Sequence, residues 1–153
     1  MYHSTRCKRK YRSKFPGLFA LIAGITFGGI NQTNAAEQLL QSIANHEAFE
    51  TTEGNLIKLL KVRLGCRIEA TFYGETGRNV ESYVFNPQQL LYATRYEYYY
   101  SDGGLTNLSE NHGKFATTLD AQTQLKVTDQ DTLKDFKQLK ILFPTQILKQ
   151  CVA

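Results

Sequence analysis

The 153-residue sequence contains no tryptophan, only three histidines and three cysteines, and none of the short motifs that define common catalytic sites. Glycine-rich phosphate loops of the G-x-G-x-x-G and G-x-x-x-x-G-K types are absent, and so are the H-E-x-x-H and C-x-x-C pairs of metal and redox sites. Without tryptophan, a platform for stacking carbohydrate is less attractive. Because no motif specifies a reaction, we predict no cofactor, no metal site and no catalytic residue.

Positive charge is concentrated near the start of the sequence. The formal net charge is +4, and six of the 18 lysines and arginines lie in residues 1–35, which contain no carboxylate. The other 118 residues carry 12 basic side chains against 14 acidic ones. Since the basic character belongs to one short segment, we do not expect nucleic acid as a partner.

Residues 1–35 are typical of a signal peptide. A basic stretch precedes an uncharged apolar run over residues 15–30, which is 16 residues long and includes four glycines. A membrane span needs about 20 apolar residues. Thr33 and Ala35 are small residues at the positions required for a cut before Ala36. We predict cleavage there, leaving residues 36–153 as a single domain in the periplasm or the medium with no membrane span; a retained membrane anchor is the alternative.

Two of the three cysteines belong to the predicted mature domain. Cys7 lies in the signal segment, whereas Cys66 and Cys151 remain and can pair in only one way. In an oxidising compartment a disulfide is the natural interpretation, and a loop of this length would contribute about 4–5 kcal/mol. The alternatives are two buried thiols or two metal ligands, although only His46 and His112 could complete a metal site.

Two segments early in the predicted domain favour helices. In residues 37–48, Leu39, Leu40 and Ile43 recur at helix-like intervals among polar residues. Residues 56–64 fit either a helix or a strand, and their leucines and lysines favour a helix that ends at Gly65.

From Cys66 onward, apolar and polar residues alternate, as in strands with one buried face. Glycine-bounded residues 74–77 favour a hairpin connection. Three strands are expected, over residues 66–73, 79–86 and 90–100. Two weaker strand patterns follow, over residues 115–119 and 123–127.

Residues 128–143 are predicted to form a helix. Thr128 or Asp129 can cap its start, Leu133 and Phe136 begin an apolar stripe, and Pro144 ends it. The predicted fold is therefore α+β, with one or two N-terminal helices packed on an antiparallel meander sheet of four to five strands, and a C-terminal helix.

Tyrosines are unusually dense in the third predicted strand. Period-two geometry places four of them on one face, whereas Arg95 and Glu97 take the other. Because the charged side chains favour water, we expect the tyrosine face to be covered by a helix. The alternative is an aromatic surface that binds a ligand or a partner, and its candidate binding residues are Tyr92, Tyr96, Tyr98 and Tyr100.

The run "FYGETGRNVESYVFNPQQLLYATRYEYYY", residues 72–100, resembles small exported bacterial proteins of uncharacterised function. In these proteins a G-E-x-G hairpin leads into a Tyr-x-Phe strand, and a tyrosine-rich strand follows a short turn. The resemblance implies a helix followed by an antiparallel meander. It implies no catalytic residues.

Three functions are compatible with these features. The favoured one is an exported, non-enzymatic module that binds a protein or an envelope component, including as an inhibitor. The second is a small hydrolase or lyase that uses a tyrosine or carboxylates on consecutive strands, namely Glu69, Glu81 and Glu97. The third is a carrier with a ligand pocket between helix and sheet, lined by Tyr92, Tyr96 and Tyr98.

Overall fold

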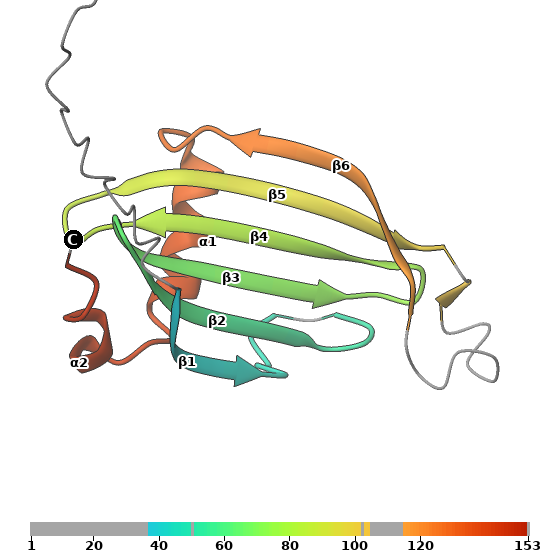
Figure 1. Ribbon diagram of the computed structural model, residues 1–153, viewed down its shortest axis with the longest axis horizontal. Helices are drawn as coiled ribbons and strands as arrows, with labels where there is room; N and C mark the ends of the chain where they lie inside the picture. The colour runs from blue at the N-terminus through green and yellow to red at the C-terminus, as the bar shows by residue number, and fades with distance from the viewer. Residues whose placement is uncertain (1–36, 50, 102, 105–114, 153) are drawn as a thin grey trace, which may run out of the picture. The chain divides into compact units, whose positions relative to one another are not determined.

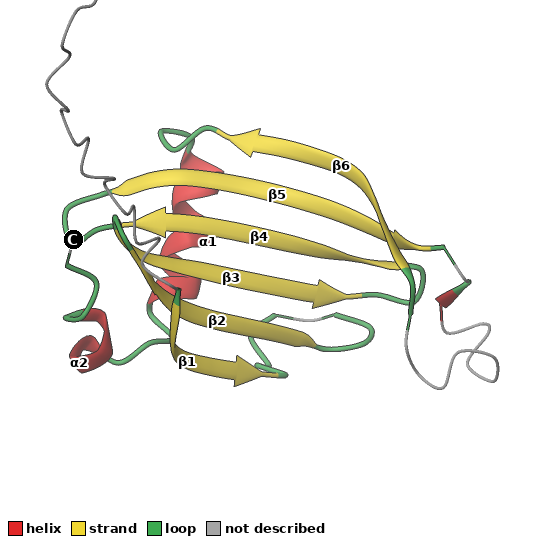
Figure 2. Cartoon of the chain, in the orientation of Figure 1, coloured by secondary structure: helices red, strands yellow, loops and turns green. Residues whose placement is uncertain are grey.

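The computed structural model describes residues 37–49, 51–101, 103–104 and 115–152. The predicted signal peptide lies outside these residues, as does His112. Figures 1 and 2 show a single sheet with one longer helix behind it. The elements are β1 (Gln38–Ala44), β2 (Asn55–Val62), β3 (Gly65–Tyr73), β4 (Gly77–Phe85), β5 (Leu90–Tyr100), β6 (Thr117–Leu125), α1 (Gln130–Lys140) and α2 (Thr145–Leu148).

The six strands form one antiparallel sheet in which every strand pairs with its neighbours in the sequence, in the order β1 to β6. The predicted hairpin at residues 74–77 is confirmed, because the Gly74 amide donates to the Gly77 carbonyl at 2.9 Å. A Cβ atom at Gly77 would collide with the backbone oxygen of Tyr98. Glycine is therefore required where the hairpin approaches β5.

The helix predicted over residues 37–48 is wrong, because this segment contains β1. A β-bulge between Leu39 and Gln41 interrupts the pairing with β2. Leu40 and Ile43 therefore both pack against the core, three residues apart, whereas Leu39 is exposed. An extra residue in a strand breaks the period of two, and here it produced the spacing of a helix.

The preference for a helix over residues 56–64 is also wrong, because β2 occupies this segment. Ile57 and Leu59 are fully buried, and Leu56 and Leu60 on the other face are half-buried. With apolar side chains on both faces, periodicity alone does not distinguish strand from helix. Pairing with β3 along the whole segment overrides helix propensity.

The side chain of Asn55 organises the connection between β1 and β2. Its amide nitrogen donates to the carbonyl oxygens of His46 and Phe49 at 3.1 and 2.9 Å, and its oxygen accepts from the His46 amide at 2.9 Å. Asn55 is buried, and these bonds satisfy its polar atoms. His46, which belongs to the segment predicted as a helix over residues 37–48, therefore lies in a structured loop.

The two weak strands predicted after residue 114 are one continuous strand, β6. Its pairing with β5 shifts between Glu97 and Tyr98, which leaves Asp120 as an extra residue. The bulge interrupts the alternation that would have indicated a single strand. This merger alone would leave four strands, but β1 and β2, which were expected as helices, bring the sheet of the described residues to six instead of the four to five expected.

The predicted C-terminal helix is confirmed as α1. Asp129 is the N-cap, and its carboxylate accepts a hydrogen bond from the Thr132 amide at 3.2 Å. The ring of Phe136 contacts those of Tyr83 and Phe85, with centroids 5.9 and 5.2 Å apart. The core between helix and sheet consists of Ile57, Leu59, Cys66, Ile68, Ala70, Tyr83, Phe85, Leu90, Ala93, Phe136, Leu139, Phe143 and Cys151.

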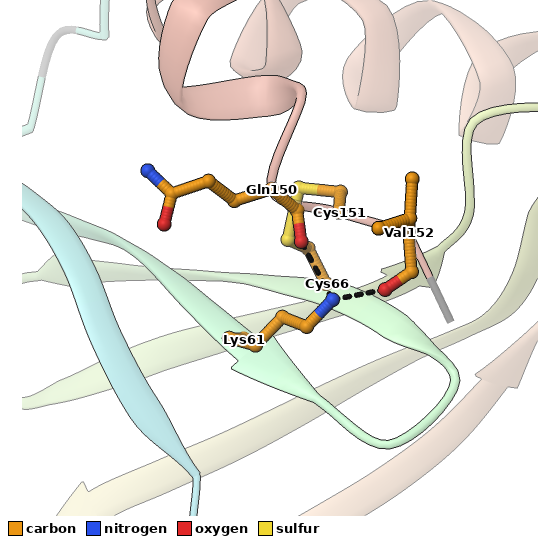
Figure 3. The surroundings of a disulfide bond; sticks show 5 residues. All are labelled: Lys61, Cys66, Gln150, Cys151 and Val152. Atoms are coloured by element: carbon orange, nitrogen blue, oxygen red, sulfur yellow. Dashed lines mark hydrogen bonds between the residues drawn. A yellow bond between two sulfur atoms is a disulfide. The ribbon is translucent and has the colours of Figure 1, made fainter.

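A disulfide joins Cys66 at the start of β3 to Cys151 after α2, as expected, with the sulfur atoms 2.06 Å apart (Figure 3). Both cysteines are buried. The Lys61 ammonium on β2 donates to the carbonyl of Gln150 at 2.6 Å and also to that of Val152. The segment after α2 is therefore fixed to the sheet both covalently and by hydrogen bonds.

Within the described ranges, no helix has the length and apolar character needed to cross a membrane.

Candidate binding surface on the open face of the sheet

Helix α1 covers the face of the sheet that carries Ala93 and Arg95. Ala93 pairs with Tyr83, both are fully buried, and Tyr83 contacts Phe136 of α1. Tyr92, the neighbour of Ala93, points to the opposite face and is 55% exposed. The expectation that the helix covers the tyrosine face is therefore wrong; among the described elements α1 lies on the other face, and we name the tyrosine side the open face.

A hydrogen-bonded network explains how Arg95 lies on the covered face. Its Nε and Nη2 atoms donate to Oε1 of Glu81 at 3.0 and 2.7 Å. The hydroxyl of Tyr83 donates to the other Glu81 oxygen at 2.8 Å. Burial raises the pKa of Tyr83 far above its ordinary value, and the Glu81 charge adds to this. The phenol therefore stays protonated and donates to the carboxylate.

Asp135 of α1 faces the same network. Burial raises the pKa of Asp135, the Glu81 charge raises it further, and the Arg95 charge opposes both effects. The hydrogen bond to Glu81 raises the pKa of Arg95. This cluster is thus a packed polar contact between helix and sheet, in which each oxygen of Glu81 already accepts a hydrogen bond.

The three carboxylates considered for acid–base catalysis do not form a row. Glu69 lies on the open face, where it pairs with Lys58 at 3.6 Å and with Arg67 at 3.5 Å. Glu81 lies on the covered face and is 8% exposed. Glu97 also lies on that side, paired with Asn79. With Glu69 and Glu81 on opposite faces, the row of three carboxylates, one of the two features that motivated a hydrolase or lyase, is not formed.

The structure brings Tyr92, Tyr96 and Tyr98 to one face, as period two predicted. They pair across to Val84, Val80 and Arg78 of β4, respectively. Tyr96 and Tyr98 are half-buried, as are the β4 residues beside them. Since these tyrosines point away from α1, they do not line a pocket between helix and sheet, and the carrier pocket as predicted is not formed.

Tyr100 differs from the other three tyrosines. It is buried, and its ring packs against Phe115, with centroids 4.9 Å apart. Burial raises the pKa of Tyr100. It belongs to the wall of a hollow at the end of the sheet and is not part of the exposed row.

Aliphatic and charged side chains complete the open face. Leu56, Leu60, Val80 and Val84 are half-buried there. Beside Tyr92, Arg67 makes a two-point ion pair with Glu37, with both nitrogen–oxygen distances 2.7 Å. A hollow of about 300 Å³ lies at this end, lined by Glu37, Val62, Arg63, Leu64, Arg67, Val84 and Tyr92.

At the opposite end of the open face, the Arg78 guanidinium lies over the Tyr98 ring, 4.9 Å from its centroid. The open face therefore combines aromatic and aliphatic side chains with the ion pairs of Glu69 to Lys58 and Arg67, and Arg67 and Arg78 lie toward its two ends. Tyrosine and arginine are the residues most enriched where proteins bind partners.

The covered face could have been assigned by comparing charges between the strands predicted over residues 79–86 and 90–100. Glu81 and Arg95 oppose each other in the register of β4 and β5, and oppositely charged residues in such positions can pair. A paired arginine no longer requires open water. The sequence argument weighed Arg95 and Glu97 within a single strand, without pairing Arg95 to Glu81, and so expected the face of Arg95 to be open to water.

Comparisons with protein-family models, with curated proteins and with solved structures find no match. Among the described residues, no three His, Cys, Asp or Glu side chains come together as a metal site.

Proposed function

We propose that this chain is an exported, non-enzymatic binding protein that binds a protein or an envelope component through the open face of its sheet. The observation that carries the proposal is the position of Tyr92, which is 55% exposed, and of the half-buried Tyr96 on the face opposite α1. In a sheet with one covered face, the other is normally polar. Here it carries half-buried leucines and valines beside tyrosines and arginines, and tyrosine and arginine are among the residue types enriched at interfaces.

The buried disulfide supports the exported part of the proposal. Disulfides persist in oxidising compartments and are rare in the cytosol. Export also accounts for the basic and apolar character of residues 1–35. The whole chain produced in a bacterial host should be recovered from the periplasm or medium, cut before Ala36. Its intact mass should rise by that of two hydrogens on reduction, whereas recovery from the cytosol with Met1 and free thiols would contradict export.

The binding surface is tested by comparing tyrosines on the two faces. Tyr92→Ser and Tyr96→Ser alter the open face, whereas Tyr99→Ser removes a 46% exposed tyrosine that points to the other side. Each purified protein is immobilised and exposed to an envelope extract of the source organism. The wild type and the Tyr99 variant should retain the same partner. The double variant that combines Tyr92→Ser with Tyr96→Ser should lose this partner.

Equal retention by all three proteins would overturn the assignment of the surface. Absence of any retained component above background would overturn the binding function. Thermal unfolding of each variant establishes that the lost binding does not arise from loss of the fold.

A further inference from the structure

Arg78 has an environment unlike that of the other strand arginines. Arg67 pairs with Glu37 and Arg95 pairs with Glu81, each at 2.7 Å. Among the described residues, no ion pair involves Arg78. Its guanidinium lies over the Tyr98 ring, and its Nε atom, like that of Arg67, is buried without a hydrogen-bond partner in the described part of the chain. Stacking on a ring leaves the terminal nitrogens of a guanidinium able to bind an oxyanion.

The register of the sheet places Arg78 between two tyrosines. It pairs with Tyr73 on β3 and with Tyr98 on β5. Since directly opposed residues share a face, the guanidinium lies in an aromatic row on the open face. This row continues to Leu119 of β6, which pairs with Tyr98.

A hollow of about 350 Å³ opens beside Arg78, and we name it the Arg78 hollow. Its lining residues are Glu53, Tyr73, Gly74, Arg78, Tyr100, Phe115 and Thr117. The stacked rings of Tyr100 and Phe115 form an apolar wall. Its size is at the lower end of the range found for pockets that bind small molecules.

Opposite charges lie in this hollow without neutralising each other. Glu53 and Arg78 both line it, but no ion pair joins them. Both charges act on the hydroxyl of Tyr100: burial raises its pKa, Glu53 adds to the rise, and Arg78 opposes it. The phenol is therefore protonated at neutral pH and can donate a hydrogen bond. The hollow thus presents a site for an anion, a site for a cation and an aromatic wall.

We propose that the Arg78 hollow binds a small α-amino carboxylic acid with an apolar side chain. Arg78 holds the carboxylate, Glu53 faces the ammonium group, and the side chain packs against Tyr100 and Phe115. A simple anion would meet the Glu53 carboxylate, and a simple cation would meet Arg78, whereas a zwitterion satisfies both. This site does not depend on the partner proposed for Tyr92 and Tyr96.

The test titrates the disulfide-bonded protein with L-phenylalanine as the probe. NMR monitors binding through the chemical shifts of the backbone amides of Gly74 and Gly77. L-phenylalanine should produce saturable shifts. Phenylalaninamide, which lacks the carboxylate, and 3-phenylpropionate, which lacks the ammonium group, should each bind about tenfold more weakly, because each leaves one charged contact unmade.

Variants of this chain test which residue binds the carboxylate of the probe and which binds its ammonium group. Arg78→Gln should weaken L-phenylalanine about tenfold or more. Arg63→Gln, an equal charge change in the exposed turn between β2 and β3, should leave affinity unchanged. Glu53→Gln should weaken L-phenylalanine but not 3-phenylpropionate. Thermal midpoints establish that each variant is folded.

Three outcomes would overturn the proposal. One is the absence of saturable shifts with L-phenylalanine in the wild type. Another is equal weakening by the variants at Arg78 and Arg63, which would indicate only a general effect of charge. The third is equal binding of L-phenylalanine and 3-phenylpropionate, which would exclude recognition of the ammonium group.

Discussion

Arg95 and Glu81 face each other across β5 and β4, beneath α1, and two nitrogens of the guanidinium donate to one oxygen of the carboxylate. Tyr83 occupies the other oxygen, so the Glu81 carboxylate is bonded on both sides. A buried carboxylate is tolerated when such partners compensate its lost hydration. The network therefore allows charge within a contact that is otherwise apolar.

Removing the arginine alone should be worse than removing both charges. Arg95→Met leaves Glu81 ionised and unpaired and should lower the free energy of unfolding by about 2–3 kcal/mol. Adding Glu81→Gln should recover part of this loss, because the neutral amide can still accept from Tyr83. Urea unfolding measures both values. A double variant no more stable than the Arg95 variant would show that the lost packing of the arginine dominates.

Stability should depend on pH through Asp135. Its pKa is raised in the folded state by burial, from an ordinary value of 3.8. As pH rises through that value, the unfolded chain loses this proton first, so the group makes folding less favourable toward neutral pH. Asp135→Asn should therefore raise the melting temperature at pH 7, and the gain should shrink as pH falls below about 4.

Asp131 provides a matched control on the same helix. It is exposed in the first turn, where a negative charge interacts favourably with the helix dipole. Asp131→Asn should lower the melting temperature slightly at pH 7. If both substitutions changed the melting temperature by the same amount in the same direction, the destabilising effect assigned to the partly buried Asp135 carboxylate would be contradicted.

Leu139 and Ile141 test which side of α1 is packed on the sheet. Leu139 is 1% exposed and Ile141, the C-cap residue, is 79% exposed. Leu139→Ala should reduce the free energy of unfolding by about 2–5 kcal/mol, because it opens a cavity in the core. Ile141→Ala should change it by less than about 0.5 kcal/mol. Denaturant unfolding, with the same dependence of the free energy on denaturant concentration for both variants, would establish the difference in stability. A large loss of stability for Ile141→Ala would indicate that this side of the helix is also covered.

The disulfide should contribute strongly to stability. Cys66→Ala with Cys151→Ala opens a loop with a sequence separation of 85 residues and should cost about 2–5 kcal/mol. Urea unfolding of the wild type with reductant should approach the curve of the double variant. The double variant should itself be insensitive to reductant. A wild type unaffected by complete reduction would show that packing around the cysteines supplies the stability.

Local chemistry was sufficient to predict α1, the hairpin between β3 and β4, and the disulfide. Asp129 and Pro144 bracket α1 by capping and by the lack of a backbone donor. The glycines of residues 74–77 define the hairpin between β3 and β4. Cys66 and Cys151 could pair only with each other once Cys7 was assigned to the predicted signal segment.

The errors arose where pairing between strands overrides local pattern. The bulge at Leu40 gave an edge strand the spacing of a helix, and β2 is apolar on both faces. The covered face depended on Glu81 and Arg95 meeting across a hairpin, which single-strand periodicity does not show. Arg78, Tyr73 and Glu53 come together only through the sheet register and the loop before β2, so the Arg78 hollow had no local signal.

The bond between Cys66 and Cys151 also determines how the domain would respond to mechanical tension. A force applied at the two ends of the chain would pass through the sulfur atoms and would bypass everything between them, from β3 to α2. Of the strands and helices in the described residues, only β1 and β2 lie outside this loop and could be drawn out. The four strands that carry Tyr73, Arg78, Tyr96 and Leu119 would stay together while their neighbours are pulled away.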